Sequence, residues 1–428
     1  MGLFGKKKGP SDDEVAAQIM KERAEKKAAD EAAAKADAAA KAAALKSQFH
    51  SSGAAAVAES KVTGLVSEMV ESPTEEAKGA QYGTPAERLA LMADMCSSPN
   101  AAKCAKRAVE VDGIKACMAT MAALESLEVQ LEGCRALSAI VVADDAAKEV
   151  VATAGGIATL AKAMKAYPKE AAVQLHGCRA LGTLCLDGAY KNKAMAAGAI
   201  GAIVVAVREH AAAEAALHGC NALSRLCGDV RGDVSDEESF SETAVHWKVI
   251  NEGGFAAIVA ALKAQPATAL VQQHGCGAIN GLCVGEGADA DARADKATDA
   301  GALEAALATL TAAETAAKPA VAEFGCLALG TLVRGETCEA RKQRAIDAGA
   351  FTAVMGAMAA HSGVVGVLEE GVGALINLCD GTDDAASSRR TLASEAGVKA
   401  ALVAAMSAQP GGDPALWKHG KDMAAQLA

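Results

Sequence analysis

Apolar residues recur at helical spacing in two kinds of segment that alternate along the chain. One kind opens at a pair of small residues, as in AGGIATLAKAM from residue 154, and carries apolar residues three and seven positions after its first one, for example Ile157, Leu160 and Met164. Spacing of i, i+3 and i+7 places these side chains on one face of an α-helix. The pattern therefore predicts a series of amphipathic helices, each with one buried face.

The other kind of segment is a ten-residue motif that returns with few changes. It reads HGCRALGTLC at 176–185, HGCNALSRLC at 218–227 and HGCGAINGLC at 274–283, and variants stand at 132–141, 324–333, 370–379 and 419–428. The glycines at its second position are separated by 44, 42, 56, 50, 46 and 49 residues. We expect each unit to hold a helix ending in AL..LC, a polar turn and a second helix opening at AGG. A period of roughly 40–47 residues with two or three helices per unit is typical of HEAT and armadillo arrays.

The resemblance to armadillo repeats is specific in the second half of the unit. YKNKAMAAGAIGAIVVAV at 190–207 is similar to the part of an armadillo repeat in which a loop with an Asn or basic residue precedes an AGGI..LV.LL helix. The HGC/AGG form resembles the arrays of protist armadillo proteins and of the armadillo regions of large multidomain kinases. The resemblance covers about residues 86–428 and implies an all-α fold, a right-handed armadillo-like superhelical solenoid.

The start of the chain has a different composition. Residues 11–48 contain no Gly or Pro and are dense in Ala, Lys, Glu and Asp, which favours helix, but their large apolar residues do not form heptads. Gly, Ser and Pro interrupt the chain at 51–53, 72–74 and 79–85. We expect residues 1–84 to be an N-terminal extension with a basic start, an Ala/Lys/Glu-rich helix and a linker. Residues 85–428 are then an armadillo-repeat array of about seven units, the last one truncated.

Composition supports an all-α array and limits its partners. Hydrophobic residues reach 51% while aromatic residues are only 3%, and much of the apolar fraction is Ala, which packs helices closely. The net charge of −11 argues against nucleic acid as a partner. The first 50 residues carry ten Lys/Arg against eight Asp/Glu, so the basic character is confined to the start.

The cysteines predict a reduced compartment. The thirteen cysteines are an odd number and lie in apolar helical stretches, some of them seven residues apart, as Cys178 and Cys185 are. This spacing suits the buried face of a helix rather than a zinc or redox motif. The longest apolar stretch, at 196–207, is shorter than the roughly 18 residues that span a bilayer. We therefore expect a cytoplasmic protein without a transmembrane helix.

Histidine recurs at the first position of the ten-residue motif, as His176, His218, His274 and His419. A metal or catalytic ladder is one interpretation, and a residue reused for helix packing is the other. Zinc requires ligands that converge on one point, whereas equivalent positions of a repeat array stack one unit apart. The packing interpretation is therefore preferred, and no metal site is expected.

Enzymatic motifs are absent from the sequence. It holds no GxxxxGK[ST], GxSxG or HExxH, and no GxGxxG follows a strand and opens a helix. Asp289, Asp291 and Asp295 have the first spacing of a calcium loop, but Ala294 and Ala300 stand where such a loop needs Gly and Glu. We expect no catalytic residue and no cofactor, and hence a protein that is not an enzyme.

Two positions of the motif show whether the chain could bind basic nuclear-localisation peptides. Armadillo arrays of the nuclear-import type carry Trp and Asn on successive inner helices. The corresponding columns here read Arg135, Arg179, Asn221, Gly277, Leu327 and Gly373, and Ala139, Thr183, Arg225, Gly281, Thr331 and Asn377. Only Asn377 matches, so the resemblance is not to that type. Arg135 and Arg179, with Lys162 and Lys165 nearby, instead predict an acidic protein or peptide partner for the N-terminal half.

The first residues, MGLFGKKKG, suggest contact with a membrane surface. They resemble the starts of membrane proteins of the ESCRT-III type and offer two apolar side chains beside a basic run. The contact residues would be Gly2, Leu3, Phe4, Lys6, Lys7 and Lys8. Lys6 stands where a myristoylation signal needs Ser or Thr.

Repetition without catalytic motifs predicts a non-enzymatic protein-protein interaction scaffold or adaptor that uses the solenoid groove. One alternative is a peripheral membrane adaptor anchored by residues 2–8. The other is a regulatory subunit of an enzyme complex.

Overall fold

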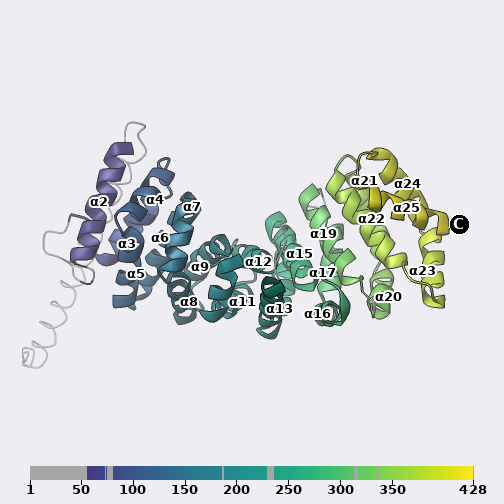
Figure 1. Cartoon of the computed structure of the whole chain (residues 1–428), viewed down its shortest axis with the longest axis horizontal. Helices are drawn as coiled ribbons and strands as arrows, with labels where there is room; N and C mark the ends of the chain where they lie inside the picture. Colours follow the sequence, from purple (N-terminus) through teal and green to yellow (C-terminus); the bar gives the residue numbers. More distant parts are fainter. Residues whose placement is uncertain are drawn as a thin grey trace, which may run out of the picture.

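The computed structural model describes residues 55–72, 74, 81–185, 188–228, 236–312, 317–335 and 337–427. Within these ranges every regular element is an α-helix. From Ala101 to Gln426 the described helices form seven consecutive triplets, and Figure 1 shows the triplets following one another along the long axis of the molecule. The protein is therefore an all-α solenoid.

Each triplet has a first, a second and a third helix. The first helices are α4 (Ala101–Glu110), α7 (Asp145–Thr153), α10 (Gly188–Ala196), α13 (Asp236–Asn251), α16 (Gly287–Asp299), α20 (Glu339–Asp347) and α23 (Asp384–Glu395). The second helices are α5 (Gly113–Ala123), α8 (Gly156–Ala166), α11 (Ala199–Glu209), α14 (Gly254–Ala264), α17 (Ala302–Thr311), α21 (Ala350–Ala360) and α24 (Val398–Ala408). The third helices, which carry the ten-residue motif, are α6 (Leu127–Ala143), α9 (Ala171–Leu184), α12 (Glu214–Cys227), α15 (Ala269–Cys283), α19 (Pro319–Leu332), α22 (Val365–Cys379) and α25 (Pro414–Gln426).

The first helix stands where the sequence pattern predicts only a polar turn, so that part of the prediction is wrong. In α7 the buried residues are Ala147, Val151 and Ala152, two of them Ala, which gives little periodic signal. The helix is held by its N-cap, because the Asp144 side chain accepts a hydrogen bond from the Ala146 backbone N–H. Three helices per unit, rather than two, is the arrangement expected of an armadillo repeat.

The AGG sequence makes the sharp turn between the first and second helices. Gly155 has φ 91°, a left-handed conformation that glycine adopts without strain, and it is the N-cap of α8. A Cβ on Gly156 would lie 2.3 Å from a Val151 side-chain carbon. These two positions therefore require glycine, one for its backbone angle and one for the close contact between α7 and α8.

The glycine of the ten-residue motif lets the third helix approach the second. A Cβ on Gly177 would lie 2.5 Å from Cγ and Sδ of Met164 in α8. Three residues earlier, Gln174 is fully buried, and its Nε2 donates to Met164 O at 2.9 Å and to Tyr167 O at 2.8 Å. Those carbonyls lie at the C-terminal end of α8, where they have no helical partner. The Gly177 contact and the two hydrogen bonds of Gln174 thus fix the second helix against the third.

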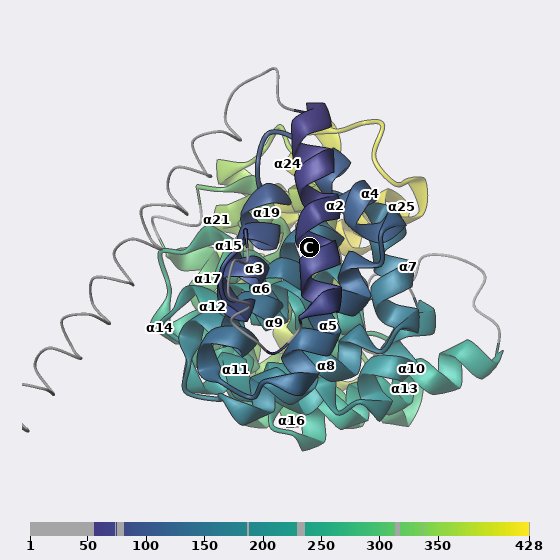
Figure 2. The ribbon, with the colours of Figure 1, turned by 90° about the vertical axis from the view of Figure 1, so that its left-hand side faces the viewer.

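Neighbouring units pack through their third helices. Each third helix contacts the next, from α6 through to α25, and α3 (Pro85–Met95) extends this layer before α6. The second helices also follow one another, and Figure 2 shows α5 and α8 below α6, with α4 and α7 to the right of α6. Their apolar faces form one continuous core rather than separate domain cores.

Helix α2 (Ala55–Glu71) lies within the region assigned by sequence to the N-terminal extension. It packs against α3, α4 and α5, and its Leu65 and Met69 side chains are buried. The buried Arg88 of α3 forms an ion pair with Glu68 of α2 at 3.3 Å. Helix α2 therefore covers the N-terminal end of the core, and the boundary at residue 85 stays a prediction.

Candidate partner-binding face

The third helices present one continuous row of positions outside the core. We use the name third-helix face for the residues that lie one before, two after and six after the motif glycine on α6, α9, α12, α15, α19 and α22, because spacings of three and four put them on one side of each helix. They are Glu132, Arg135, Ala139, His176, Arg179, Thr183, His218, Asn221, Arg225, His274, Gly277, Gly281, Phe324, Leu327, Thr331, Glu370, Gly373 and Asn377, and all except Ala139, Gly277 and Gly281 are half-buried or exposed.

Three of the repeated histidines line up on this face. Burial, followed by the charges of Arg135 and Arg179, lowers the pKa of His176 to about 4. The pKa values of His218 and His274 are also lowered, mainly by burial and then by Arg179 and Arg225 respectively. These imidazoles are therefore neutral at neutral pH. Among the described residues, no group of three or more His, Cys, Asp or Glu could hold a metal ion.

Arg135, which the sequence assigns to partner binding, is occupied within the protein. Its Nε donates to Glu132 at 2.6 Å and its Nη1 to Asp94 of α3 at 2.8 Å. Its Nη2 donates to the Ala90 carbonyl at 3.1 Å. The guanidinium therefore joins α3 to α6, and its charge is balanced by two carboxylates.

Arg179 has a different environment. It is exposed, and no carboxylate of the described residues lies within ion-pair distance of it. Arg225 of the next third helix is half-buried, and its Nε donates to Asn221 Oδ1 at 2.7 Å. The two arginines line one hollow of about 140 Å³ between α9 and α12. The other lining residues are Val142, Cys178, Gly182, Thr183, His218 and Asn221.

Lys162 and Lys165 lie on the second helix α8 and not on the third-helix face. Lys162 Nζ pairs with Glu125 Oε1 at 3.0 Å, with both side chains largely exposed. Lys165 Nζ donates to the Ala197 carbonyl at 3.2 Å. The structure therefore brings Arg179 together with Arg225, and leaves the two lysines on another layer of the solenoid.

Arg225 and Asn221 were not selected from the sequence, although both stand in the columns compared with nuclear-import arrays. Arg179 lies two residues after its motif glycine, whereas Arg225 lies six residues after the next one. Comparison within a column does not pair such positions. Stacked neighbouring helices bring different positions of the motif side by side. A search for the pair would therefore have to compare the second position after one motif glycine with the sixth position after the next.

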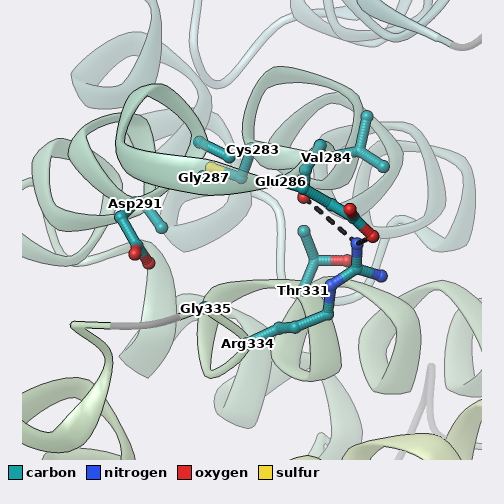
Figure 3. Close-up of a pocket in the computed structure, with 11 residues that line it drawn as sticks. Cys283, Val284, Glu286, Gly287, Asp291, Thr331, Arg334 and Gly335 are labelled. Carbon is teal, nitrogen blue, oxygen red and sulfur yellow. Dashed lines mark hydrogen bonds and ion pairs between the residues drawn. The ribbon is translucent and has the colours of Figure 1, made fainter.

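A larger hollow, of about 230 Å³, lies between the α15–α16 turn and the end of α19. Figure 3 shows Arg334 reaching across it, with Nη2 3.1 Å from the Gly285 carbonyl that accepts its hydrogen bond and 3.5 Å from Glu286 Oε1. Cys283 at its edge is buried, and burial raises the pKa of this thiol to about 12. Its described lining residues include no histidine, so no thiolate–base pair is formed there.

The acidic run in α16 has a structural role. Asp291 is buried and accepts hydrogen bonds from Arg341 Nη2 at 2.5 Å and from the Thr337 backbone N–H at 3.1 Å. Arg341 also pairs with Asp295. These aspartates lie in a helix and join α16 to α20, which agrees with the rejection of a calcium loop.

All thirteen cysteines are buried and free, as the helical spacing predicted. Burial raises the pKa values of the Cys134 and Cys220 thiols to about 12. A thiol with so high a pKa is a poor nucleophile. The cysteines therefore serve as small core residues.

The membrane-contact residues predicted from the sequence, Gly2 to Lys8, lie outside the described residues. Among the residues that are described, none of the helices is both long and apolar enough to cross a bilayer.

Comparison with known proteins supports the fold. No protein-family model and no curated protein matches the chain. An engineered protein solved by the Northeast Structural Genomics Consortium is similar over 90% of this chain and 87% of its own, with TM-score 0.64 and 20% identity. A designed armadillo repeat protein in complex with the peptide (KR)4 is similar over 64% of this chain and 99% of its own, with TM-score 0.49 and 18% identity. With the three-helix units, the likeness to the first of these proteins supports an all-α repeat solenoid.

Proposed function

We propose that this chain is a non-enzymatic protein-binding scaffold or adaptor, and that the third-helix face receives an extended segment of its partner. The observation that carries the proposal is the unbroken stacking of third helices from α6 to α25, which repeats the same three surface positions in every unit. Solenoids of this kind form extended binding surfaces without a catalytic pocket.

The spacing of the units suits an extended ligand. Packed helices lie roughly 8–10 Å apart, and an extended chain rises about 3.3 Å per residue. A partner segment therefore passes one unit for about every three of its residues. Phe324 and Leu327 on α19 provide half-buried apolar contacts, and polar residues of the face lie on the neighbouring helices α15 and α22.

Two observations support a role without catalysis. The described residues that line the hollow beside Cys283 include no histidine, and in the hollow between α9 and α12 burial raises the pKa of Cys178 far above its usual range. Catalysis by a nucleophile requires a lowered pKa or a neighbouring base. Neither thiol has a lowered pKa, because burial raises that of Cys283 to about 12 and also raises that of Cys178, although His218 lines the same hollow as Cys178.

Within the armadillo-like fold we propose the HGC/AGG subtype and not the nuclear-import type. Asn377 is the one residue of the face that matches the Trp/Asn columns of import receptors. Its Nδ2 donates to the Gly330 carbonyl of the preceding third helix at 3.1 Å. This side chain therefore serves packing between units, which supports the proposal.

Anchoring at a membrane is the second candidate, because the first residues combine Leu3 and Phe4 with three lysines. Co-sedimentation with phosphatidylserine vesicles would compare the full chain with a variant that lacks residues 1–9. Equal sedimentation would remove this candidate.

Site-specific photo-crosslinking tests the scaffold proposal. Val142 at the edge of the face and Val403 on the second helix α24 are matched positions, exposed by 47% and 49%. A photoreactive amino acid at Val142 in the full chain is expected to crosslink to one short segment of a partner protein, identified by mass spectrometry. The same residue at Val403 is expected to give no such product. Partners that crosslink only through Val403 would contradict the proposal.

A further inference from the structure

We propose that the hollow between α9 and α12 is an anion-recognition subsite in which Arg179 and Arg225 bind an anionic side chain, carboxylate or phosphate, of an acidic protein segment. This inference rests on the proposed function, because it names the chemistry of the ligand on the third-helix face. It differs from the sequence-based prediction, since Arg225 replaces Arg135 and the two lysines of α8.

The charge of the hollow is the first argument. The chain contains 53 Asp and Glu against 42 Lys and Arg, yet the described residues that line this hollow include no carboxylate. Glu214 lies outside this lining, with Oε1 3.8 Å from His218 and a side chain that is 70% exposed. Two arginines without balancing carboxylates are unusual in an acidic protein, and they attract an anion.

The other arginines of the array provide the contrast. Arg135 on the same face is balanced by Asp94 and Glu132. Arg341 is balanced by Asp291 and Asp295 between first helices. Arginines that join units in this protein are therefore given carboxylate partners by the fold, whereas Arg179 and Arg225 are not.

The Arg225 side of the hollow is also preorganised. Asn221 accepts the Nε hydrogen of Arg225, which holds that guanidinium and leaves its terminal nitrogens for another acceptor. The floor of the hollow is rigid because α9 and α12 are in close contact at Gly182, where an added Cβ would lie 3.1 Å from Ala222 Cα. Fixed donors in a partly desolvated site bind an anion more strongly than mobile surface groups do.

The size and lining of the hollow indicate the class of ligand. A volume of about 140 Å³ fits one side-chain head group, since a water molecule takes up about 30 Å³. Guanidinium groups bind carboxylate and phosphate in the same bidentate geometry. The described lining residues include no Phe, Tyr or Trp on which a base could stack. These features favour an acidic protein segment over a nucleic acid.

Fluorescence anisotropy with the full chain tests the subsite. The probes are three labelled twelve-residue Gly/Ser peptides that carry four Glu, four phosphoserine or four Gln residues at the same positions. We expect the Glu or the phosphoserine peptide to bind at least about tenfold more tightly than the Gln peptide. The acidic peptide that binds more tightly shows whether the hollow prefers a carboxylate or a phosphate.

Substitutions locate the binding. Arg179→Gln and Arg225→Gln are each expected to lower the affinity for the acidic peptide about tenfold. Arg208→Gln is the matched control, because Arg208 is an exposed arginine of α11 that pairs with Glu209 and lies outside the hollow. Thr183→Glu would place a carboxylate in the hollow and is expected to block the peptide without loss of folding, so a defect caused by misfolding is recognisable.

Equal binding of the acidic peptide by wild type, Arg179→Gln and Arg225→Gln would overturn the subsite. If crosslinks at Val142 nevertheless locate a partner segment, the scaffold proposal stands and only the subsite fails. If Val142 gives no crosslinks but the acidic peptide depends on both arginines, the subsite is supported and the larger partner-binding face is wrong.

Discussion

Arginines occupy two regions of this solenoid in opposite ways. Between the first helices α16, α20 and α23, Arg341 and Arg389 are buried, and each pairs with carboxylates of the preceding first helix. In the hollow between α9 and α12, Arg179 and Arg225 are exposed or half-buried, and no carboxylate of the described residues pairs with them. The first region uses charge to join units, and the second leaves charge for a ligand.

The largest effect is expected where the buried pair is broken. Arg341→Met leaves Asp291, whose side chain is 5% exposed, without its cation. Removing one partner of a buried ion pair costs about 3–5 kcal/mol. Urea unfolding followed by tryptophan fluorescence measures the loss, because Trp247, one of the two tryptophans, donates to Asp289 on α16. Adding Asp291→Asn to Arg341→Met should restore part of the stability, and a loss below about 1 kcal/mol for the single variant would show that the pair is not structural.

The buried His246 extends the comparison to the dependence of stability on pH. His246 is 7% exposed, its Nδ1 accepts from Arg293 Nη1 at 2.6 Å, and its Nε2 lies 3.2 Å from the Cys227 carbonyl. Burial, and then Arg293, lowers its pKa to about 4. Because the unfolded state binds more protons between pH 4 and 6.5, stability from this group is complete above pH 6.5 and is lost as pH falls towards 4.

The size of this pH effect is about 3 kcal/mol for His246. Unfolding curves between pH 7.5 and 4.5, recorded for wild type and His246→Gln, measure it as a difference in pH slope. The variant should be less stable at pH 7.5 but should lose less on acidification. Parallel pH profiles for the two proteins would show that His246 does not carry the effect.

On the third-helix face the corresponding prediction concerns binding. The pKa of His218 is lowered by burial and by Arg179, while Glu214 raises it. His176 and His274 lie beside it, and Arg225 faces His274. An anion bound between the two arginines would offset their charge and raise the pKa of His218, so a proton is taken up with the ligand. Affinity for the Glu peptide should therefore rise from pH 7.5 to 6.

His218→Gln provides the check on this proton uptake, because it removes the titrating group and keeps a polar side chain. The pH dependence of peptide affinity should become flatter in this variant. Arg208→Gln should keep the wild-type slope. An unchanged slope in His218→Gln would locate the proton uptake elsewhere.

The smallest effect is expected for the stability of the face itself. Arg179→Gln removes a side chain that has no ion pair among the described residues, and should change the free energy of unfolding by less than about 0.5 kcal/mol. Urea unfolding beside the Arg341→Met protein measures the difference. A loss close to that of Arg341→Met would mean that Arg179 is structural and that the two regions do not differ.

Sequence reasoning found the parts of the fold that repeat strongly. The AGG glycines and the HGC motif mark positions where helices meet closely, as Gly156 and Gly177 do, and such contacts allow only glycine. The cysteines were recognised as core residues because they also recur at fixed positions of apolar helical segments. The first helices were missed, because α7 and α10 have nine residues each and α7 buries mainly small side chains.

The candidate site was only partly predictable. Arg135 stands in the same column as Arg179, but its partner Asp94 lies 41 residues earlier and outside the ten-residue motif. Column comparison could not show that one arginine is balanced and the other is not. The pairing of Arg179 with Arg225 also needed the structure, since it depends on how neighbouring helices are offset.

The most direct test of binding at the third-helix face combines the crosslinker with the arginine variants. The full chain, carrying the photoreactive residue at Val142 or at Val403, is irradiated with the labelled acidic peptide in the wild-type background and with Arg179→Gln and Arg225→Gln together. We predict a crosslink at Val142 in wild type, little product with both arginines replaced, and none at Val403. Equal yields at Val142 and Val403, unaffected by the arginine substitutions, would contradict the account.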